Sequence, residues 1–429
     1  MQCSWGPKDQ TSSRRTTPAT LSLLLALCGG LPLATQAQNT AAAPAASAPA
    51  GPAALKIGFI CPLSGGSADF GNSARLGAEL AVREVNEVGG YMGRPVQLVA
   101  RDDKANPDEG RRVSEALLTT DKVAFTVGFC NTGVAMKSLD LFQQQQQVLM
   151  VPVATGSAIT ARYPAAESFV FRMSPRDTLQ ARFLINEAVQ RRGLKKIAFF
   201  ADTTGYGEGG LADLTKFLGE QGLKPVHVAR FELGVNSLQT EVQAALAAGA
   251  EALIAYTVGP ELAVLANARA AARSNVPLFG PWPMSFRTVW ERSNGAAEGA
   301  MMVQSIVPDL SNERRASFLA RLKKHAGDEP VLSLMAAAQT YDAVHLMMRA
   351  VFQTRGQTGG PQLKAALENL QHAYSGVVTT HSQPFSAQDH DAFTANMIWL
   401  ATWRKGALQY VYPEDAKRAS IIRRKETGG

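Results

Sequence analysis

Short apolar segments alternate with segments of helical periodicity from residue 55 onward, and no other feature of this sequence limits its fold as strongly. The first apolar segment, 55–60, leads into a turn rich in glycine and serine over 62–71. Apolar residues then recur at helical spacing over 75–88. The same pattern predicts further strands at 95–100, 123–128, 147–153, 169–173, 196–201, 225–231 and 252–256. It predicts further helices at 109–120, 178–191, 209–220, 237–247 and 261–272.

Strands that are separated by helices of this length form parallel sheets with right-handed crossovers. The strands are more numerous than one doubly wound sheet usually needs, so the pattern predicts an α/β fold with two doubly wound parallel-sheet lobes. Ligands of such sheets bind beyond the carboxyl ends of the strands. The turns of interest therefore follow Ile60, Gly128, Val153, Ala201, Tyr256 and Phe279.

The charge of the chain is concentrated at its two ends. Of the formal net charge of +7, residues 1–37 carry +2 and residues 416–429 carry +4, which leaves +1 for the body. A near-neutral body has no extended field for a phosphate backbone, so nucleic acid is not expected as a partner. With 46% apolar and 18% charged residues, the chain is not expected to be disordered.

The front of the chain is expected to be a secretory signal peptide. Arg14 and Arg15 precede an apolar run at 21–27 that is too short to span a bilayer, and Ala37 ends a plausible cleavage site. We therefore expect residues 1–37 to be removed near Ala37 on export. A twin-arginine signal and a lipoprotein signal at Cys28 are the alternatives. Residues 38–54, dominated by alanine and proline without charge, are expected to form a flexible linker.

A glycine-rich motif follows one of the predicted strands. Gly205, Gly207 and Gly210 fit the dinucleotide-binding spacing. However, Asp202 and two threonines lengthen the turn between strand and helix, and the aspartate would repel a pyrophosphate. A flexible turn that displays Tyr206 is the better interpretation.

Other candidate sites are weaker. His381 and the segment 389–391 could suggest a metal, but their spacing fits no common zinc pattern. No histidine stands beside a serine or cysteine that it could activate at a strand end. We therefore expect neither an enzyme nor a cofactor.

Two cysteines, Cys61 and Cys130, each follow a strand of the first lobe. In an exported, oxidising compartment a disulfide between them is physically plausible. The alternative is that both are small buried residues near the cleft. The sequence leaves both possibilities open.

Several segments resemble, in their order and spacing, the periplasmic Leu/Ile/Val-binding protein family, and the similarity covers most of 55–412. They include Pro-Leu-Ser-Gly-Gly at 62–66, Gly-Ala-Glu-Leu-Ala-Val at 77–82, Val-Pro-Val-Ala-Thr at 151–155, Tyr-Gly-Glu at 206–208 and Gly-Pro-Glu at 259–261. The resemblance implies a periplasmic, monomeric receptor that closes on a small ligand and delivers it to the membrane subunits of an ABC importer. A periplasmic sensor that presents its ligand to a signalling receptor is the alternative.

The resemblance also implies three chain crossings between the lobes, near Arg176, near Ser305 and between His381 and His390. The expected lobes are then 55–176 with 305–384 and 177–304 with 385–412, followed by a peripheral basic tail over 413–429.

In that family a Ser/Thr after the third strand and a segment after the fourth hold the ligand carboxylate. The matching positions are Thr132, the backbone at Val153, and Thr155, with Cys130 beside them. Hydroxyls and N–H groups near helix starts favour an anion, although both threonines could instead be ordinary helix caps. The resemblance further places Phe70 at the apolar end of the ligand and Tyr206 opposite it.

The amino-group side departs from the family pattern. Val258 and Trp282 stand where the family's amino-acid binders carry an aromatic and an acidic residue, and a buried ammonium without an acceptor is costly. We therefore expect a carboxylate without an α-amino group, such as an aromatic or 2-oxo acid, with Met284 adding adaptable contact. Asp202 or Glu208 could still supply an acceptor, so the sequence does not exclude an amino acid.

Overall fold

The computed structural model describes residues 53–310, 312–420 and 425–426. The predicted signal peptide, its cleavage site and nearly all of the predicted linker lie outside these residues.

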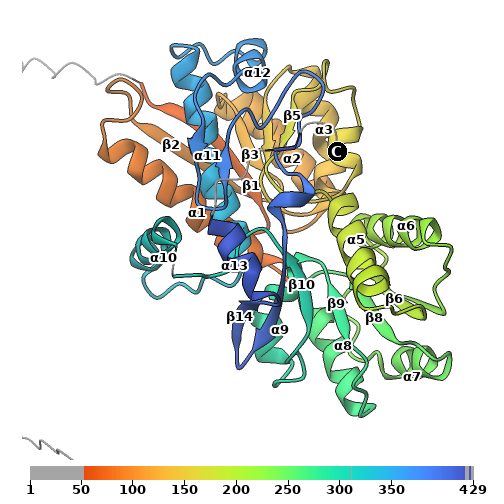
Figure 1. The fold of residues 1–429 in the computed structure, drawn as a ribbon. Coiled ribbons are helices and arrows are strands. Elements are labelled where there is room, and N and C mark those ends of the chain that lie inside the picture. The colour runs from red at the N-terminus through yellow and green to blue at the C-terminus, as the bar shows by residue number, and fades with distance from the viewer. Residues whose placement is uncertain (1–52, 311, 421–424, 427–429) are drawn as a thin grey trace, which may run out of the picture. The chain divides into compact units, whose positions relative to one another are not determined.

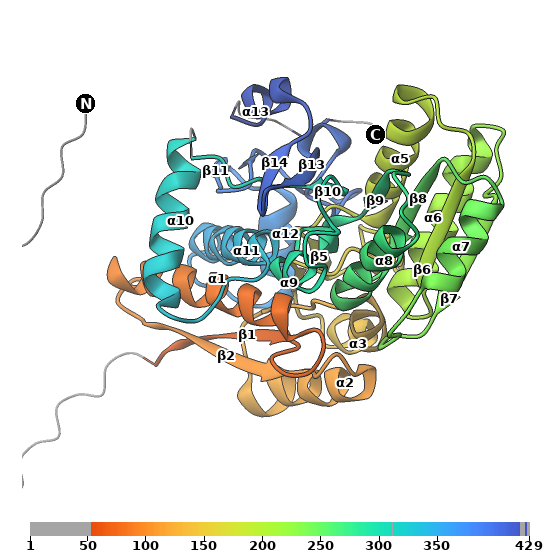
Figure 2. The same cartoon turned by 90° about the horizontal axis from the view of Figure 1, so that it is seen from below.

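The first lobe is built on a five-stranded sheet in the order β2-β1-β3-β4-β5, and all of its strands are parallel. Its strands are β1 Leu55–Cys61, β2 Val96–Asp102, β3 Thr126–Gly128, β4 Leu149–Val151 and β5 Val170–Arg172. Helices α1 (Ala68–Glu87) and α11 (Leu334–Gln353) lie on one face, and α2 (Pro107–Ala116) and α3 (Thr132–Gln144) lie on the other (Figure 2). Both faces are therefore covered, which explains why every residue of β3, β4 and β5 is buried.

The remaining elements of this lobe are short or peripheral. They are η1 Leu117–Asp121, α4 Ala158–Ala161, α10 Glu313–Ala326, α12 Gly360–Glu368, and the hairpin of β11 Tyr374–Ser375 and β12 Thr380–His381.

The second lobe is built on a seven-stranded sheet in the order β14-β13-β10-β9-β8-β6-β7, surrounded by the green helices of Figure 1. Its parallel strands are β6 Ile197–Asp202, β7 His227–Phe231, β8 Ala252–Tyr256, β9 Leu278–Gly280 and β10 Met301–Gln304. Two antiparallel strands, β13 (Trp399–Arg404) and β14 (Ala407–Tyr410), extend it beyond β10. Its helices are α5 Asp177–Ile185, η2 Asn186–Arg191, α6 Gly205–Glu220, α7 Gln239–Ala247, α8 Gly259–Ala271, η3 Trp282–Ser285 and α9 Arg287–Arg292.

The two sheets confirm the predicted α/β fold with two lobes, and the antiparallel extension is an addition to it. In each lobe the strand order reverses between the first strand and the third, β1 and β3 in one and β6 and β8 in the other. Such a reversal opens a crevice at the carboxyl ends of the strands. Each sheet therefore contributes one crevice.

Two helices begin earlier than the sequence predicts. Helix α1 starts at Ala68 instead of residue 75, and Gly71 lets it pack on the backbone of Pro62, because a Cβ there would lie 1.7 Å from the Pro62 carbonyl oxygen. Helix α6 starts at Gly205 instead of residue 209, because the Thr204 hydroxyl accepts from the N–H groups of the first turn. The glycines that suggested turns thus lie within first helical turns.

The third crossing also runs differently from the prediction. Phe385 and His390 pack on Phe171 of β5, with ring centroids 5.0 and 3.8 Å away. The Arg172 N–H donates to the His390 carbonyl, and the Ala392 N–H donates to the Arg172 carbonyl. The predicted boundary between 384 and 385 therefore falls within a segment that packs on the first lobe. The crossing to β13 comes after Ala392 and contains the short helix η4, Ala395–Met397.

The basic tail begins with a helix, α13 (Pro413–Ser420), which the lack of apolar periodicity did not predict.

Candidate ligand-binding site

A cavity of about 280 Å³ lies where the two crevices meet. Every loop that lines it follows a strand of one of the two main sheets or contains the start of a helix. The lining residues are Ser67, Phe70, Ala105, Pro107, Cys130, Asn131, Thr132, Gly133, Val134, Thr155, Thr204, Gly205, Tyr206, Leu233, Val258 and Trp282.

Two hydroxyls of the first lobe face this cavity. The Thr132 Oγ1 accepts from the N–H of Gly156 at 3.2 Å, which leaves its own proton available to donate. The Thr155 hydroxyl is buried close to the Asp177 carboxyl and the Tyr206 phenol, and it influences the pKa of both, but no well-formed hydrogen bond holds it within the described part of the chain. Both threonines can therefore donate to a ligand oxygen.

The first turns of α3 and α6 meet at the cavity from opposite lobes. A Cβ built on Gly205 would lie 3.6 Å from the Cα of Gly133. Asn131 precedes α3 without capping it through its side chain. The partial positive charges of both helix N-termini, together with the uncapped N–H groups at the start of α3, therefore favour an anion in this cavity.

Aromatic rings form the apolar wall. Phe70 of α1 lies 5.9 Å from Trp282 and 5.4 Å from Phe286 between ring centroids, so the wall joins the two lobes. The Trp282 backbone is held by Gln180 and Gln304 through hydrogen bonds of 3.2 and 3.0 Å. Its indole Nε1–H is buried and has no partner among the described residues.

No charged side chain is among the lining residues that the structure describes. A buried carboxylate, Asp177, contacts the lining residue Thr155: its N–H donates to the Thr155 carbonyl, and its Oδ1 accepts from the Tyr256 hydroxyl at 2.8 Å. Asp177 is 1% exposed, and burial raises the pKa of its carboxyl to about 7. Burial likewise raises the pKa of the Tyr206 phenol well above its usual value.

Seven of the nine residues predicted for ligand binding line the cavity: Phe70, Cys130, Thr132, Thr155, Tyr206, Val258 and Trp282. The other two are fully buried outside the lining: Val153, and Met284, whose side chain packs against Gly280. The sequence reasoning missed Asp177 because nothing in its sequence context signals that this helix start is buried.

The two alternative ammonium acceptors lie outside the lining as well. Glu208 forms an exposed ion pair with Arg230. Asp202 accepts from the backbone and hydroxyl of Thr204 at 2.9 and 2.5 Å and thereby shapes the turn into α6.

The raised pKa of Asp177 predicts a pH-dependent stability. The folded state binds this proton more tightly than the unfolded state, whose pKa is near 3.8. The stabilisation is therefore complete below about pH 4 and is lost as the pH rises through about 7, on the order of 4 kcal/mol. The Asp177→Asn variant keeps an acceptor for Tyr256 and should lose less stability between pH 5 and 8 in urea titrations. Equal slopes for wild type and variant would contradict the assignment. Burial also raises the pKa of Asp103 to about 7. Part of the dependence of stability on pH should therefore remain in both wild type and variant.

A disulfide joins Cys61, at the end of β1, to Cys130, which follows β3. The two strands are neighbours in the first sheet. The bond therefore fastens together the two loops that flank the crevice of the first lobe.

The disulfide predicts the thiol content of the mature protein. If the chain is cleaved near Ala37 as the sequence predicts, only these two of the 4 cysteines remain, so the unfolded, unreduced protein should then show no titratable thiol. Two titratable thiols would exclude the bond. Because it closes a long segment, its reduction should lower the free energy of unfolding by roughly 2–5 kcal/mol.

The cluster that suggested a metal is dispersed. His390 Nε2 lies 3.0 Å from Glu368, and Asp391 pairs with Arg172 at 2.6 Å. Within residues 53–310, 312–420 and 425–426 no group of three potential metal ligands occurs. No helix within those ranges is long and apolar enough to cross a membrane.

Comparisons with known proteins agree with the two-lobed α/β fold. Leu/Ile/Val-binding protein homolog 3 of Brucella melitensis is 31% identical over 252 residues, which cover 58% of this chain and 67% of the relative. The substrate-binding protein LivJ of Streptococcus pneumoniae, solved with isoleucine, superposes with a TM-score of 0.72 at 22% identity over 84% of this chain and 100% of its own. A solute-binding protein of an R. palustris ABC transporter, solved with benzoate, superposes with a TM-score of 0.71 at 22% identity. The match covers 83% of this chain and 95% of that protein.

The sequence profile of the periplasmic binding protein family matches residues 54–407, which include both sheets except the last three residues of β14. The chain therefore belongs to the periplasmic binding protein family, with the type I fold that its Leu/Ile/Val-binding relatives represent.

Proposed function

We propose that this protein is the extracytoplasmic receptor of an ABC importer of the branched-chain amino-acid type, and that its ligand is a small carboxylate without an α-amino group. The family binds small solutes and is not enzymatic. An aromatic acid such as benzoate, or a 2-oxo acid, is the class of ligand that we favour.

One observation carries this proposal: hydroxyls and two helix N-termini converge on a cavity whose lining has no charged side chain. These groups suit an anion, because the hydroxyls and the uncapped start of α3 can donate hydrogen bonds to a carboxylate oxygen, and both helix dipoles favour negative charge. An ammonium would meet Val258 and Trp282, which offer no oxygen acceptor. The rings of Phe70, Tyr206 and Trp282 suit a flat apolar body.

Calorimetric titration with benzoate, 2-oxoisocaproate, leucine and valine tests the proposal. We expect at least one of the two simple acids, benzoate or 2-oxoisocaproate, to bind with a micromolar or lower dissociation constant. Leucine should bind at least about 100-fold more weakly. Micromolar leucine binding by the wild type would overturn the ligand class. The protein would then be a receptor for ordinary branched-chain amino acids.

A variant of Asp177 further distinguishes a simple acid from leucine as the ligand. If leucine binds, Asp177 is a buried carboxylate in contact with the lining that could meet its ammonium, so Asp177→Asn should weaken leucine binding more than binding of a simple acid. If the ligand lacks the amino group, the same variant should bind the simple acid as well as or better than wild type, because a neighbouring negative charge is removed.

The two threonines should each contribute to the affinity. Thr132→Ala and Thr155→Ala are expected to weaken binding of the simple acid by roughly 1–3 kcal/mol each, because each removes a hydroxyl donor to an ionised carboxylate. Thr160→Ala is a useful control, because this hydroxyl bonds Asp391 outside the cavity lining. Unchanged titration curves for both cleft variants would exclude a carboxylate at this position.

A further inference from the structure

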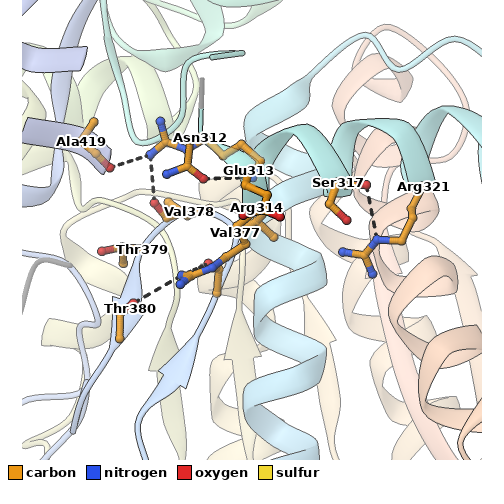
Figure 3. Close-up of a pocket in the computed structure, with 12 residues that line it drawn as sticks. Asn312, Glu313, Arg314, Ser317, Arg321, Val377, Val378, Thr379, Thr380 and Ala419 are labelled. Carbon is orange, nitrogen blue, oxygen red and sulfur yellow. Dashed lines mark hydrogen bonds between the residues drawn. The ribbon is translucent and has the colours of Figure 1, made fainter. Parts of the chain in front are cut away.

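The basic tail runs from one lobe back to the other. At its start, the Tyr412 hydroxyl donates to Glu187 of the second lobe at 2.5 Å, and the Arg191 guanidinium lies over the Tyr412 ring. At the end of α13, the Ala419 carbonyl accepts from Arg315 of α10, beside Val378 of the first lobe (Figure 3).

Lys425, further along the tail, binds the segment 384–391. Its ammonium pairs with Asp389 at 2.5 Å and donates to the carbonyls of Pro384, at 2.9 Å, and Asp391. The side chain is 13% exposed, and its three N–H donors meet three oxygens of one segment. The Glu426 N–H donates to Thr394, 3.2 Å away, at the far end of the same segment.

The segment that Lys425 holds is the first-lobe end of the third crossing. It packs on β5 through Phe385 and His390 and leads through η4 into β13 of the second lobe. The tail follows β14, the last strand of the second lobe. A contact from this tail to the first-lobe end of the crossing therefore links the two lobes again, beside the three covalent crossings.

We infer that Lys425 makes the tail a fourth, noncovalent connection across the hinge, and that this connection restrains the opening of the lobes. The lobes pivot about their crossings, so a restraint at the third crossing acts on the opening motion although it lies outside the cleft. Lys425 is thus a positioning residue for closure.

Hydrogen exchange in the ligand-free protein tests the inference. Lys425→Met should speed exchange of the amides over 384–394, and also of the first turns of α3 and α6, which face each other across the cleft, by about threefold to tenfold. Asp389→Asn should give a smaller change at the same sites, because the two carbonyl bonds remain. Lys224→Met, which removes an exposed lysine of the second lobe, should change neither region.

The cleft amides decide the outcome. If Lys425→Met speeds exchange only at 384–394, Lys425 supports that segment locally and does not restrain the lobes. If its exchange rates equal those of Lys224→Met, Lys425 makes no such connection. Either result overturns the inference. If Lys425→Met lowers the melting temperature by more than a few degrees, Asp389→Asn gives the same comparison in a chain that keeps the lysine. None of these readouts needs a ligand, so the test stands even if the proposed ligand class fails.

Discussion

Replacing Trp282 with glutamate is expected to weaken binding of benzoate or 2-oxoisocaproate by about 100-fold or more. The side chain is 3% exposed and forms part of the aromatic wall with Phe70. Glutamate would place a second anion beside the ligand carboxylate in a cavity whose described lining offers no cation to compensate it. Calorimetry or fluorescence titration measures the loss.

Two further variants define the cause. Trp282→Ala removes the wall without adding charge, and should weaken aromatic acids more than small aliphatic ones. Trp290→Glu is the matched control: this tryptophan packs on Trp403 outside the lining, and the variant should bind within about threefold of wild type. Equal losses for Trp282→Glu and Trp290→Glu would show that altered folding, rather than the anion in the cleft, causes the effect.

A gain of leucine binding by Trp282→Glu would show that a restored acceptor suffices, although Val258 leaves the other half of that position unchanged.

Removing the carboxylate of Asp391 is expected to lower the free energy of unfolding by about 3–5 kcal/mol. Arg172 is completely buried, and its Nε–H donates to Asp391 at 2.6 Å. Burial alone would raise the pKa of Asp391, but the guanidinium groups of Arg172 and Arg176 and the Thr160 hydroxyl together outweigh it and lower this pKa below its usual value. Asp391→Ala leaves the guanidinium without its counter-ion, and an uncompensated buried charge is strongly destabilising.

Urea unfolding at neutral pH measures this cost. Asp140→Ala breaks an ion pair of similar length, 2.7 Å, whose two side chains are each 38% exposed, and should cost less than about 1 kcal/mol. A cost for Asp391→Ala no larger than that of the control would show that the buried pair does not hold the third crossing to β5. Because the folded pKa of Asp391 is lowered, its contribution should also disappear as the pH falls through that pKa.

Much of the fold could be predicted because strand patterns depend on local residue order. The segment 252–256 is β8 without any shift, and most other strands differ from prediction by one to three residues at an end. The starts of α1 and α6 were less predictable, because Gly71 and Gly207 usually favour turns. In both helices a glycine is needed for close approach to neighbouring backbone, at Pro62 and Asp202, and tertiary packing creates that need.

In the candidate site, too, some features could be predicted from local sequence and others depend on tertiary packing. Loops that follow parallel strands must gather at one edge, so residues such as Thr132 and Tyr206 could be brought together from the sequence. Asp177 and the packing of Phe385 on the first lobe could not, since both depend on burial between distant segments. The described contacts of Lys425 depend on such long-range packing as well.

The meeting of two helix N-termini at the cavity has a consequence for discrimination. Two partial positive ends that face each other repel when nothing lies between them, and this repulsion opposes closure of the empty protein. If the ligand is the proposed carboxylate, its charge replaces this repulsion by attraction and would supply part of the free energy of closing. A neutral molecule of the same shape, such as benzamide, would fill the aromatic wall without supplying that free energy. Selection against uncharged analogues would then occur at the closing step rather than at first contact, and it should weaken as added salt screens the helix ends.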